Sequence, residues 1–262
     1  MGNCQEFNGK WALVTGASSG IGAELARELA SHGARLILTA RREDRLQVLA
    51  AELAAKGTEI RIVLADLNDP AAPQKIYDAT AGAGLAVEIL INNAGLGQYG
   101  AFHQSPEEQE LSQVRVNCEA MVRLTRLFLP PMVERRRGWV LVLASTASFQ
   151  PVPYLTTYAA SKAFDRFFAQ GLAAEVARFG VKVTALCPGP TETEFFDVAH
   201  ASVFKGRSIQ PAAEVARQAI AALARGQQTL IPYFAGKIAA LMVRLLPVGW
   251  ITSLVERLAR PK

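Results

Sequence analysis

The chain has 262 residues, half of them hydrophobic, with 28 basic and 23 acidic residues and a formal net charge of +5. This length and composition are typical of one enzyme-sized globular domain, and no linker, repeat or low-complexity tract divides it. The modest charge lacks the basic stripe with interleaved aromatic residues that nucleic-acid binding favours, so we expect no nucleic-acid partner.

Six short apolar runs alternate with longer stretches whose pattern is typical of amphipathic helices. This alternation predicts an α/β fold with a doubly wound, mostly parallel sheet between two helical layers. We expect one three-layer αβα domain over residues 1–232, and residues 233–262 as an amphipathic helical extension of it. The predicted strands are Trp11–Thr15, Leu36–Thr39, Ile60–Leu64, Ile89–Ile91, Val140–Leu143 and Val181–Leu186.

The first predicted strand runs directly into the glycine-rich turn Gly16–Gly22, and a helix is predicted to follow at once. Its three glycines permit a tight turn, close approach of a ligand to the main chain and close packing of helix on strand. The N–H groups and the positive dipole end of the helix suit a pyrophosphate. The spacing G-x-x-x-G-x-G differs from the commoner G-x-G-x-x-G, so a plain turn is the alternative.

Polar or turn-forming residues follow the later strands. Asp66 follows the third strand, Asn92–Gly95 the fourth, Ser145 the fifth, and Pro188 with Gly189 the sixth. Each alone is ordinary turn chemistry. In a parallel sheet, however, the carboxyl ends of the strands meet at the edge where ligands bind, so together these residues predict a cofactor cleft.

Tyr158 and Lys162 lie four residues apart in TTYAASKAF, a segment predicted to be helical. Both side chains then project from one helix face into the same volume. An ammonium beside a phenol favours the phenolate and lowers the pKa of the tyrosine. The pair is therefore a candidate general acid/base. A chance pair on a helix surface is the alternative.

The motifs TGASSGIG, NNAG, Ser145, YAASK and PGPTET, in this order and with these separations, resemble the short-chain dehydrogenase/reductase family. The resemblance covers residues 10 to about 230. It implies a single Rossmann-type domain, an NAD(P) cofactor and an oxidoreductase that interconverts a carbonyl and a secondary alcohol. The catalytic residues that it implies are Asn117, Ser145, Tyr158 and Lys162.

The resemblance also implies a role for each of these residues. Ser145 would donate a hydrogen bond to the substrate oxygen, and Tyr158 would exchange a proton with it. Lys162 would lower the pKa of the tyrosine and hold the nicotinamide ribose, and Asn117 would position a water molecule. The cofactor-binding residues that it implies are Gly16, Ser18, Ser19, Gly20, Ile21, Gly22, Arg41, Asp66, Leu67, Asn93, Ala94, Gly95, Tyr158, Lys162, Pro188, Gly189, Thr191 and Thr193.

The end of the second predicted strand bears on the choice of cofactor. An NAD enzyme of Rossmann type places a carboxylate there for the ribose 2′-hydroxyl, whereas this chain has Arg41 and Arg42. A guanidinium suits a 2′-phosphate. We therefore expect NADP(H), held by Arg41, and we expect Arg42 to be a solvated loop side chain. NAD(H) is the alternative.

Two apolar segments, Phe149–Leu155 and Phe195–Phe204, correspond to the variable walls of the substrate site in this family. They predict a lipophilic carbonyl or alcohol as substrate, unless the apolar side chains pack against the lid itself. The predicted substrate-binding residues are Ser145, Phe149, Tyr154 and Phe195.

Three other functions are open: a redox-silent NADPH-binding regulator, an interaction module that keeps the fold, and a membrane-surface reductase of lipid-like ketones. The intact Ser145, Tyr158 and Lys162 count against the first two. The cysteines are three in number, scattered, and without metal-ligand spacing, which predicts a reduced cytoplasmic setting and no metal site. We expect a homodimer or homotetramer.

Residues 233–262 predict two short amphipathic helices separated by Pro247. Charged residues interrupt the apolar run, so it falls short of the roughly 20 residues that a membrane span needs. We expect the apolar residues to pack over the substrate cleft or against a partner subunit. Contact with a membrane surface, which Trp250 and the nearby cations would favour, is the less favoured alternative, so we expect no sedimentation with anionic vesicles.

Overall fold

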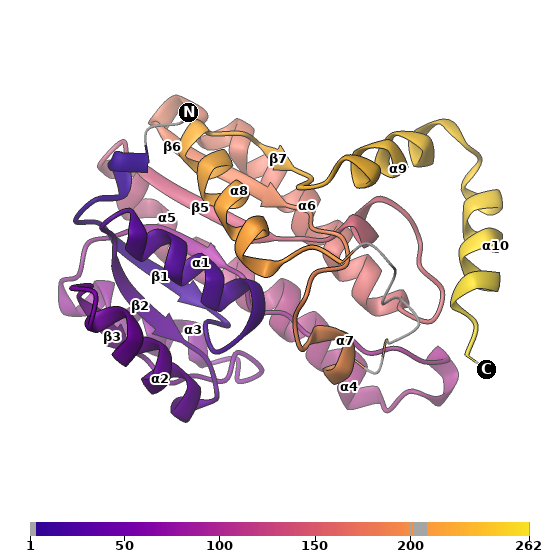
Figure 1. The fold of residues 1–262 in the computed structure, drawn as a ribbon, viewed down its shortest axis with the longest axis horizontal. Helices are drawn as coiled ribbons and strands as arrows, with labels where there is room; N and C mark the ends of the chain where they lie inside the picture. Colours follow the sequence, from indigo (N-terminus) through magenta and orange to yellow (C-terminus); the bar gives the residue numbers. More distant parts are fainter. Residues whose placement is uncertain (1–3, 200, 202–208, 262) are drawn as a thin grey trace.

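The computed structural model describes residues 4–199, 201 and 209–261. Within them lies a sheet of seven parallel strands in the order β3-β2-β1-β4-β5-β6-β7 (Figure 1). The predicted doubly wound parallel sheet is confirmed. The strands are β1 (Trp11–Thr15), β2 (Arg35–Thr39), β3 (Ile60–Ile62), β4 (Val87–Asn92), β5 (Gly138–Leu143), β6 (Val181–Leu186) and β7 (Thr229–Leu230).

Helices cover both faces of the sheet and bury one hydrophobic cluster on each side. One cluster packs α1 (Gly20–Ser31), α2 (Glu43–Ala54) and α8 (Ala212–Arg225) on the sheet. The other packs α3 (Ala72–Asp78), α5 (Met121–Glu134) and α6 (Thr156–Val176) on the opposite face. The remaining helices are α4 (Glu107–Gln113), α7 (Phe195–Val198), α9 (Phe234–Leu245) and α10 (Val248–Ala259).

Two strands differ from the prediction. β3 is only three residues long and lies at the edge of the sheet, so Leu64, predicted to be in the strand, is exposed. β7 was not predicted, because two residues are too short for a hydrophobic period to be recognised. The C-terminal helices flank Pro247 and project beyond the sheet (Figure 1). Across the described part of the chain, every helix is too short or too polar to cross a membrane.

The ends of β1 and β4 are tied together where the glycine-rich turn begins. The Thr15 hydroxyl donates to the Ile91 carbonyl and accepts hydrogen bonds from the N–H groups of Asn93 and Ala94. The Asn93 amide donates to the Thr15 carbonyl at 2.8 Å. A Cβ at Gly22 would collide with this amide and with the backbone of the turn, so only glycine fits where α1 begins.

We expect Gly22→Ala to destabilise the fold by roughly 1–3 kcal/mol, because the added methyl must separate α1 from the end of β4. Gly171→Ala is a matched control, since Gly171 lies in the middle of α6 with open space around it. This control should stabilise the protein by about 0.5–1 kcal/mol. Chemical unfolding measures both changes. A Gly22→Ala variant as stable as the wild type would contradict the close packing described above.

Candidate active site

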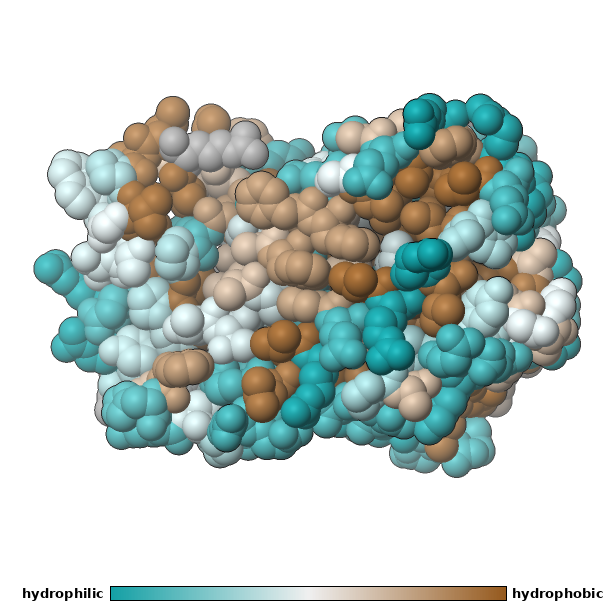
Figure 2. Space-filling model, turned by 180° about the vertical axis from the view of Figure 1, so that it is seen from behind, coloured by the Kyte–Doolittle hydropathy of each residue, from teal (hydrophilic) through white to brown (hydrophobic). Residues whose placement is uncertain are grey.

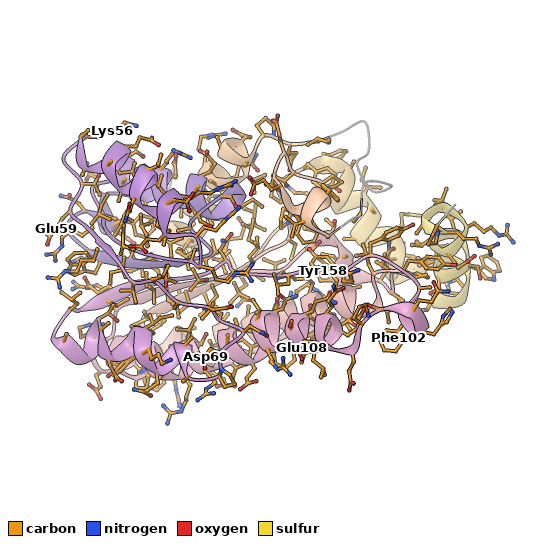
Figure 3. The ribbon with its side chains drawn as sticks, turned by 90° about the horizontal axis from the view of Figure 1, so that it is seen from below. Lys56, Glu59, Asp69, Phe102, Glu108 and Tyr158 are labelled. Atoms are coloured by element: carbon orange, nitrogen blue, oxygen red, sulfur yellow. The ribbon has the colours of Figure 1, made fainter. Side chains whose placement is uncertain are left out.

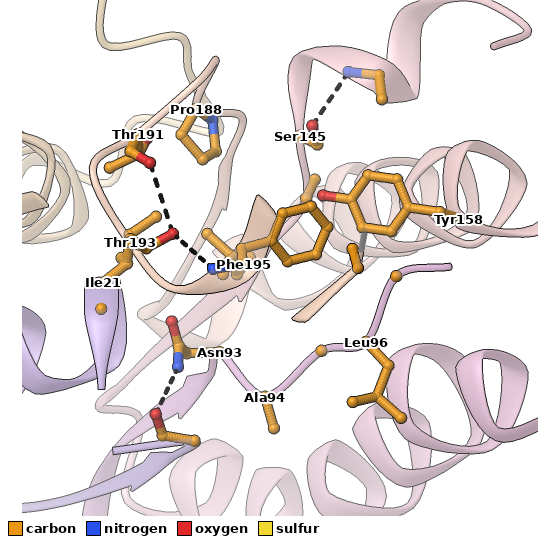
Figure 4. Close-up of a pocket in the computed structure, with 18 of the residues that line it drawn as sticks. Ile21, Asn93, Ala94, Leu96, Ser145, Tyr158, Pro188, Thr191, Thr193 and Phe195 are labelled. Atoms are coloured by element: carbon orange, nitrogen blue, oxygen red, sulfur yellow. Dashed lines mark hydrogen bonds between the residues drawn. The ribbon is translucent and has the colours of Figure 1, made fainter. Parts of the chain in front are cut away.

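A cavity of about 590 Å³ lies at the carboxyl edge of the sheet. The glycine-rich turn and the ends of β2 and β4 form one part of its wall, and the segments after β5 and β6 form another. The helix α9 closes the far side. Figure 3 places Tyr158 between the sheet and the C-terminal helices, and Figure 4 shows its phenol facing into the cavity from α6.

The structure brings most of the predicted site residues to this one cavity. The predicted residues that line it are Gly16, Ser18, Ser19, Gly20, Ile21, Gly22, Arg41, Asp66, Leu67, Asn93, Ala94, Gly95, Ser145, Phe149, Tyr158, Pro188, Gly189, Thr191, Thr193 and Phe195. Three predicted residues, Asn117, Tyr154 and Lys162, are absent from its described lining. The first and the last of these lie directly behind it, as set out below.

Ser145 and Tyr158 both line the cavity, and the Ser145 hydroxyl lowers the pKa of the Tyr158 phenol. Ser145 also accepts a hydrogen bond from the N–H of Ala147 at 3.1 Å, which fixes its rotamer at the start of a short 3-10 helix. The ring of Phe195 lies 5.1 Å from the Tyr158 ring, centroid to centroid. The two hydroxyls therefore face the cavity beside an apolar surface (Figure 4).

The pKa of Tyr158 differs in direction from the prediction. Burial raises the pKa of the phenol above its usual value of 10.0, and the Lys162 ammonium and the Ser145 hydroxyl oppose this only in part. The carboxylate of Asp165 raises it further. In this structure the phenol is thus held neutral, as a proton donor requires.

Lys162 is buried, and two hydrogen bonds from its ammonium go to the protein. It donates to the Leu143 carbonyl at 2.6 Å and to Asp165 Oδ2 at 3.0 Å. The side chains of Lys162 and Asp165 are only 3% and 2% exposed. Burial alone would lower the pKa of Lys162, but Asp165 and Tyr158 together raise it above 10.5, so the ammonium stays charged.

Asp165 is a residue of the candidate site that the sequence did not predict. It lies three residues after Lys162, on the same face of α6, and an i,i+3 spacing was a signal that could have found it. Its second oxygen, Oδ1, has no hydrogen-bond partner among the described residues. A buried carboxylate held by one lysine therefore stands behind the candidate proton donor.

Asn117 lies in a π-helical segment, Val114–Ala120, and not in an ordinary α-helix as predicted. Its amide donates to the Leu96 carbonyl and the Ser161 hydroxyl, and its oxygen accepts from the Leu96 N–H. The wider turn of the π-helix thus carries the buried Asn117 amide, which connects the segment after β4 to α6, next to Lys162. Both N–H groups of this amide are engaged by the protein, while its oxygen accepts one hydrogen bond and has a second lone pair, so the predicted water stays a prediction.

Arg41 and Arg42 both line the cavity beside the glycine-rich turn. Arg42, predicted to be a solvated loop side chain, is 41% exposed and also donates to the hydroxyls of Ser18 and Ser19 and pairs with Glu194. Arg42 thereby connects the glycine-rich turn to the segment after β6, and these contacts fix the position of its side chain. Arg41 makes no ion pair within the described residues, so its charge is available to a ligand.

The predicted substrate residue Tyr154 is not part of the described cavity lining. Its hydroxyl donates to Glu256 of α10 at 2.8 Å, and its backbone adopts a left-handed conformation (φ 64°) just before α6. Tyr233 was not predicted, and it lines the cavity where it packs on Gly189. Of the predicted wall Phe195–Phe204, residues 200 and 202–204 lie outside the described residues.

The lining fits a dinucleotide in two respects. At Gly16 and Gly20 an added Cβ would stand 2.9 Å from Asn93 and Thr193, so a side chain there would fill the approach to the turn. The N-terminus of α1 then presents its N–H groups to the same space, where a pyrophosphate binds favourably. No group of three or more metal-ligating side chains is found in the described part of the chain.

Comparison with known proteins agrees with this geometry. The family model described as short chain dehydrogenase matches residues 10–202, and the chain belongs to this family of oxidoreductases. The very-long-chain 3-oxoacyl-CoA reductase of Homo sapiens is 37% identical over 187 residues, which cover 69% of this chain and 59% of that protein. The aligned region thus spans less than two thirds of this relative.

Two solved structures share the whole architecture. A short-chain dehydrogenase from Sphingobium yanoikuyae in complex with NADPH is 33% identical, with a TM-score of 0.82, covering 90% of this chain and 93% of that one. A short-chain dehydrogenase/reductase from Burkholderia phymatum in complex with NAD is 26% identical, with a TM-score of 0.82, covering 92% and 93%. The Rossmann-type fold of the chain is therefore established, and a nicotinamide cofactor is supported.

We expect Asp165→Asn to shift the pH dependence of alcohol oxidation toward lower pH. Removing the carboxylate removes a negative charge that raises the pKa of Tyr158, so the phenolate forms more easily. The measurement is the acidic limb of kcat/KM against pH. Asp69→Asn, which breaks an exposed pair with Lys75, is the control and should leave the limb unmoved. If the acidic limb of the Asp165→Asn profile lies at the wild-type pH, the Asp165 carboxylate does not raise the pKa of Tyr158.

Proposed function

We propose that this protein reduces a lipophilic carbonyl compound with NADPH, with Tyr158 as the general acid. The observation that carries the proposal is the pair of hydroxyl side chains, Ser145 and Tyr158, that line one cavity with an apolar wall. The reverse reaction, oxidation of the secondary alcohol, uses the same groups in the opposite order. A redox-silent role would have no need of a buried proton donor backed by a charged lysine.

The residues of the chain supply orientation and a proton. The carbonyl oxygen accepts hydrogen bonds from Ser145 and Tyr158, and the phenol gives up its proton to that oxygen as negative charge develops there. The Lys162 ammonium then stabilises the phenolate that remains. The nicotinamide, when bound, supplies the hydride. Donors fixed in this way are each worth about 3–4 kcal/mol in the transition state.

The preference for NADPH rests on Arg41. Its guanidinium lines the cavity at the end of β2, where an NAD enzyme of this fold would have a carboxylate. Arg42 is held by serine hydroxyls and Glu194, which leaves Arg41 as the cation free to meet a 2′-phosphate within the described chain. One solved relative is in complex with NADPH and another with NAD, so the relatives do not select a cofactor. The positive charge of Arg41 is what favours NADPH.

The lipophilic character of the substrate rests on the other wall of the cavity. It is built from side chains of the segment after β5, of α7 and of the C-terminal helices, and similarity to a reductase of very-long-chain acyl compounds agrees with it. The apolar residues of this wall are Phe149, Val152, Leu155, Phe195, Phe196, Val198, Val243 and Val255.

Tyr158→Phe should lower kcat by roughly 10²–10⁴-fold while leaving NADPH binding near the wild-type value, because it removes the proton and little else. Turnover of a panel of carbonyls, followed by NADPH oxidation, measures the first effect, and fluorescence titration with NADPH measures the second. The matched control Tyr77→Phe alters a phenol that packs on Phe128 between α3 and α5, outside the described cavity lining. If Tyr158→Phe keeps the wild-type turnover, Tyr158 is not the general acid.

Arg41→Asp should move the ratio of kcat/KM for NADPH over NADH by at least about 10-fold toward NADH, or about 1.4 kcal/mol. The aspartate repels a 2′-phosphate and accepts from a 2′-hydroxyl, so both effects act in one direction. Arg45→Asp, at a residue that pairs with Glu194 and does not appear in the described cavity lining, is the control. An unchanged ratio in Arg41→Asp would show that another residue selects the cofactor.

A cytoplasmic location and a homodimeric or homotetrameric state remain predictions. Within the described chain Cys118 and Cys187 are both free thiols, as a reduced compartment favours.

A further inference from the structure

The C-terminal helices carry their large apolar side chains on the outside. Phe234, Ile238, Leu241, Met242 and Leu245 follow one another along one face of α9 at helical spacing, and their exposed fractions range from 44% to 76%. Ten of the twenty large hydrophobic residues that are exposed in the described chain belong to this short extension. Figure 2 shows hydrophobic residues gathered over the region of α9, at the upper left of the view from behind.

The second helix repeats this arrangement. Trp250, Leu254 and Leu258 stand four residues apart on α10 and are 73%, 59% and 70% exposed. Together with the α9 face they form what we call the outer apolar face. The sequence predicted that these residues would pack over the cleft or against a partner subunit. In the single chain the large ones are exposed, so packing over the cleft does not bury them, and packing against a partner subunit stays a prediction.

Both helices are nevertheless anchored firmly on their inner sides. Small residues of α9, among them Gly236 and Ala240, line the cavity. On α10, Ile251 and Ala259 are buried, and the Tyr99 hydroxyl donates to the Ala259 carbonyl at 2.8 Å. The outer apolar face therefore does not arise from a loosely docked tail. The helices present small residues inward and large ones outward.

The charge of this extension indicates what covers the face. Residues 233–262 contain five basic residues and one acidic residue, so they carry four of the five net positive charges of the chain. Lys237 and Arg257 are exposed beside the apolar residues. Apolar side chains, a tryptophan and cations on one helical surface match the interface of an anionic bilayer.

A second copy of the chain matches this surface poorly. In a twofold contact the same patch meets itself, so the excess of positive charge would face an equal excess across the interface. Like charges brought together in this way cost free energy, whereas anionic headgroups neutralise them. The charge pattern thus favours lipid over self-association and reverses the order of preference that the sequence suggested.

We propose that the outer apolar face of α9 and α10 docks on the surface of an anionic bilayer, with the helices lying in the interface. The inner side of α9 is a wall of the cavity, so docking places the cavity next to the lipid. A lipophilic substrate then passes from the bilayer to Tyr158 without crossing bulk water. This last step rests on the proposed function, while the docking itself does not.

The test is co-sedimentation of the full-length protein with vesicles of phosphatidylcholine containing about 30% phosphatidylglycerol, at about 0.15 M salt. We expect binding to these vesicles and weaker binding to pure phosphatidylcholine. The double variant Leu245→Glu with Leu254→Glu should lower the partition coefficient at least about 10-fold. A double variant with Val48→Glu and Leu64→Glu, which alters exposed apolar residues elsewhere, is the matched control and should bind as the wild type does.

Two further measurements separate failure of the docking proposal from failure of the proposed function. Circular dichroism and turnover of a water-soluble ketone should be unchanged in the Leu245/Leu254 double variant, because neither residue is part of the described cavity lining. A protein that binds vesicles but reduces no ketone would refute the proposed function and keep the docking. Absence of vesicle binding by the wild type overturns the docking, as does a dimer, seen by sedimentation velocity, that this double variant converts to monomer.

Discussion

The adjacency of β1 and β4 is the constraint on which the rest of the site depends. The strand order reverses direction between these two strands, so the loops that leave them diverge and open a crevice at the carboxyl edge. Thr15, at the end of β1, ties the two strands together because its hydroxyl donates to the Ile91 carbonyl of β4 and accepts from the Asn93 N–H that follows β4. Gly22 allows α1 to approach the same point, and the N–H groups of the helix then face the cavity.

Much of this could be predicted from the sequence, because it depends on local pattern. Continuous apolar runs marked six strands, and the polar residues after them marked the edge where the cavity lies. Partners set by tertiary packing could not be predicted in the same way. Tyr154 points to α10, and Arg42 bonds to the glycine-rich turn, because of where distant segments come to rest. No periodicity in the sequence reports such contacts.

The pair of Lys162 and Asp165 shows how such a contact changes the chemistry. The sequence predicted a lysine that lowers the pKa of Tyr158, and its ammonium does act in that sense. Burial of the phenol and the nearby carboxylate act more strongly in the opposite sense. A buried pair of this kind is costly to break, at about 3–5 kcal/mol when one partner is removed, because the other charge is left uncompensated. The lysine is thereby fixed in position and in charge before any ligand arrives.

The C-terminal helices connect the cavity to the surface of the molecule. A helix that closes a cavity over a bound cofactor needs small residues on its inner side, and α9 supplies glycine and alanine there. Its large apolar residues are then left to face outward, where water makes them unfavourable. Large apolar residues on a water-exposed surface are expected to have a partner, and the cations that accompany them restrict which partner it is. The helix α9 thus lies between the cavity, which has an apolar wall, and the outer apolar face with its cations.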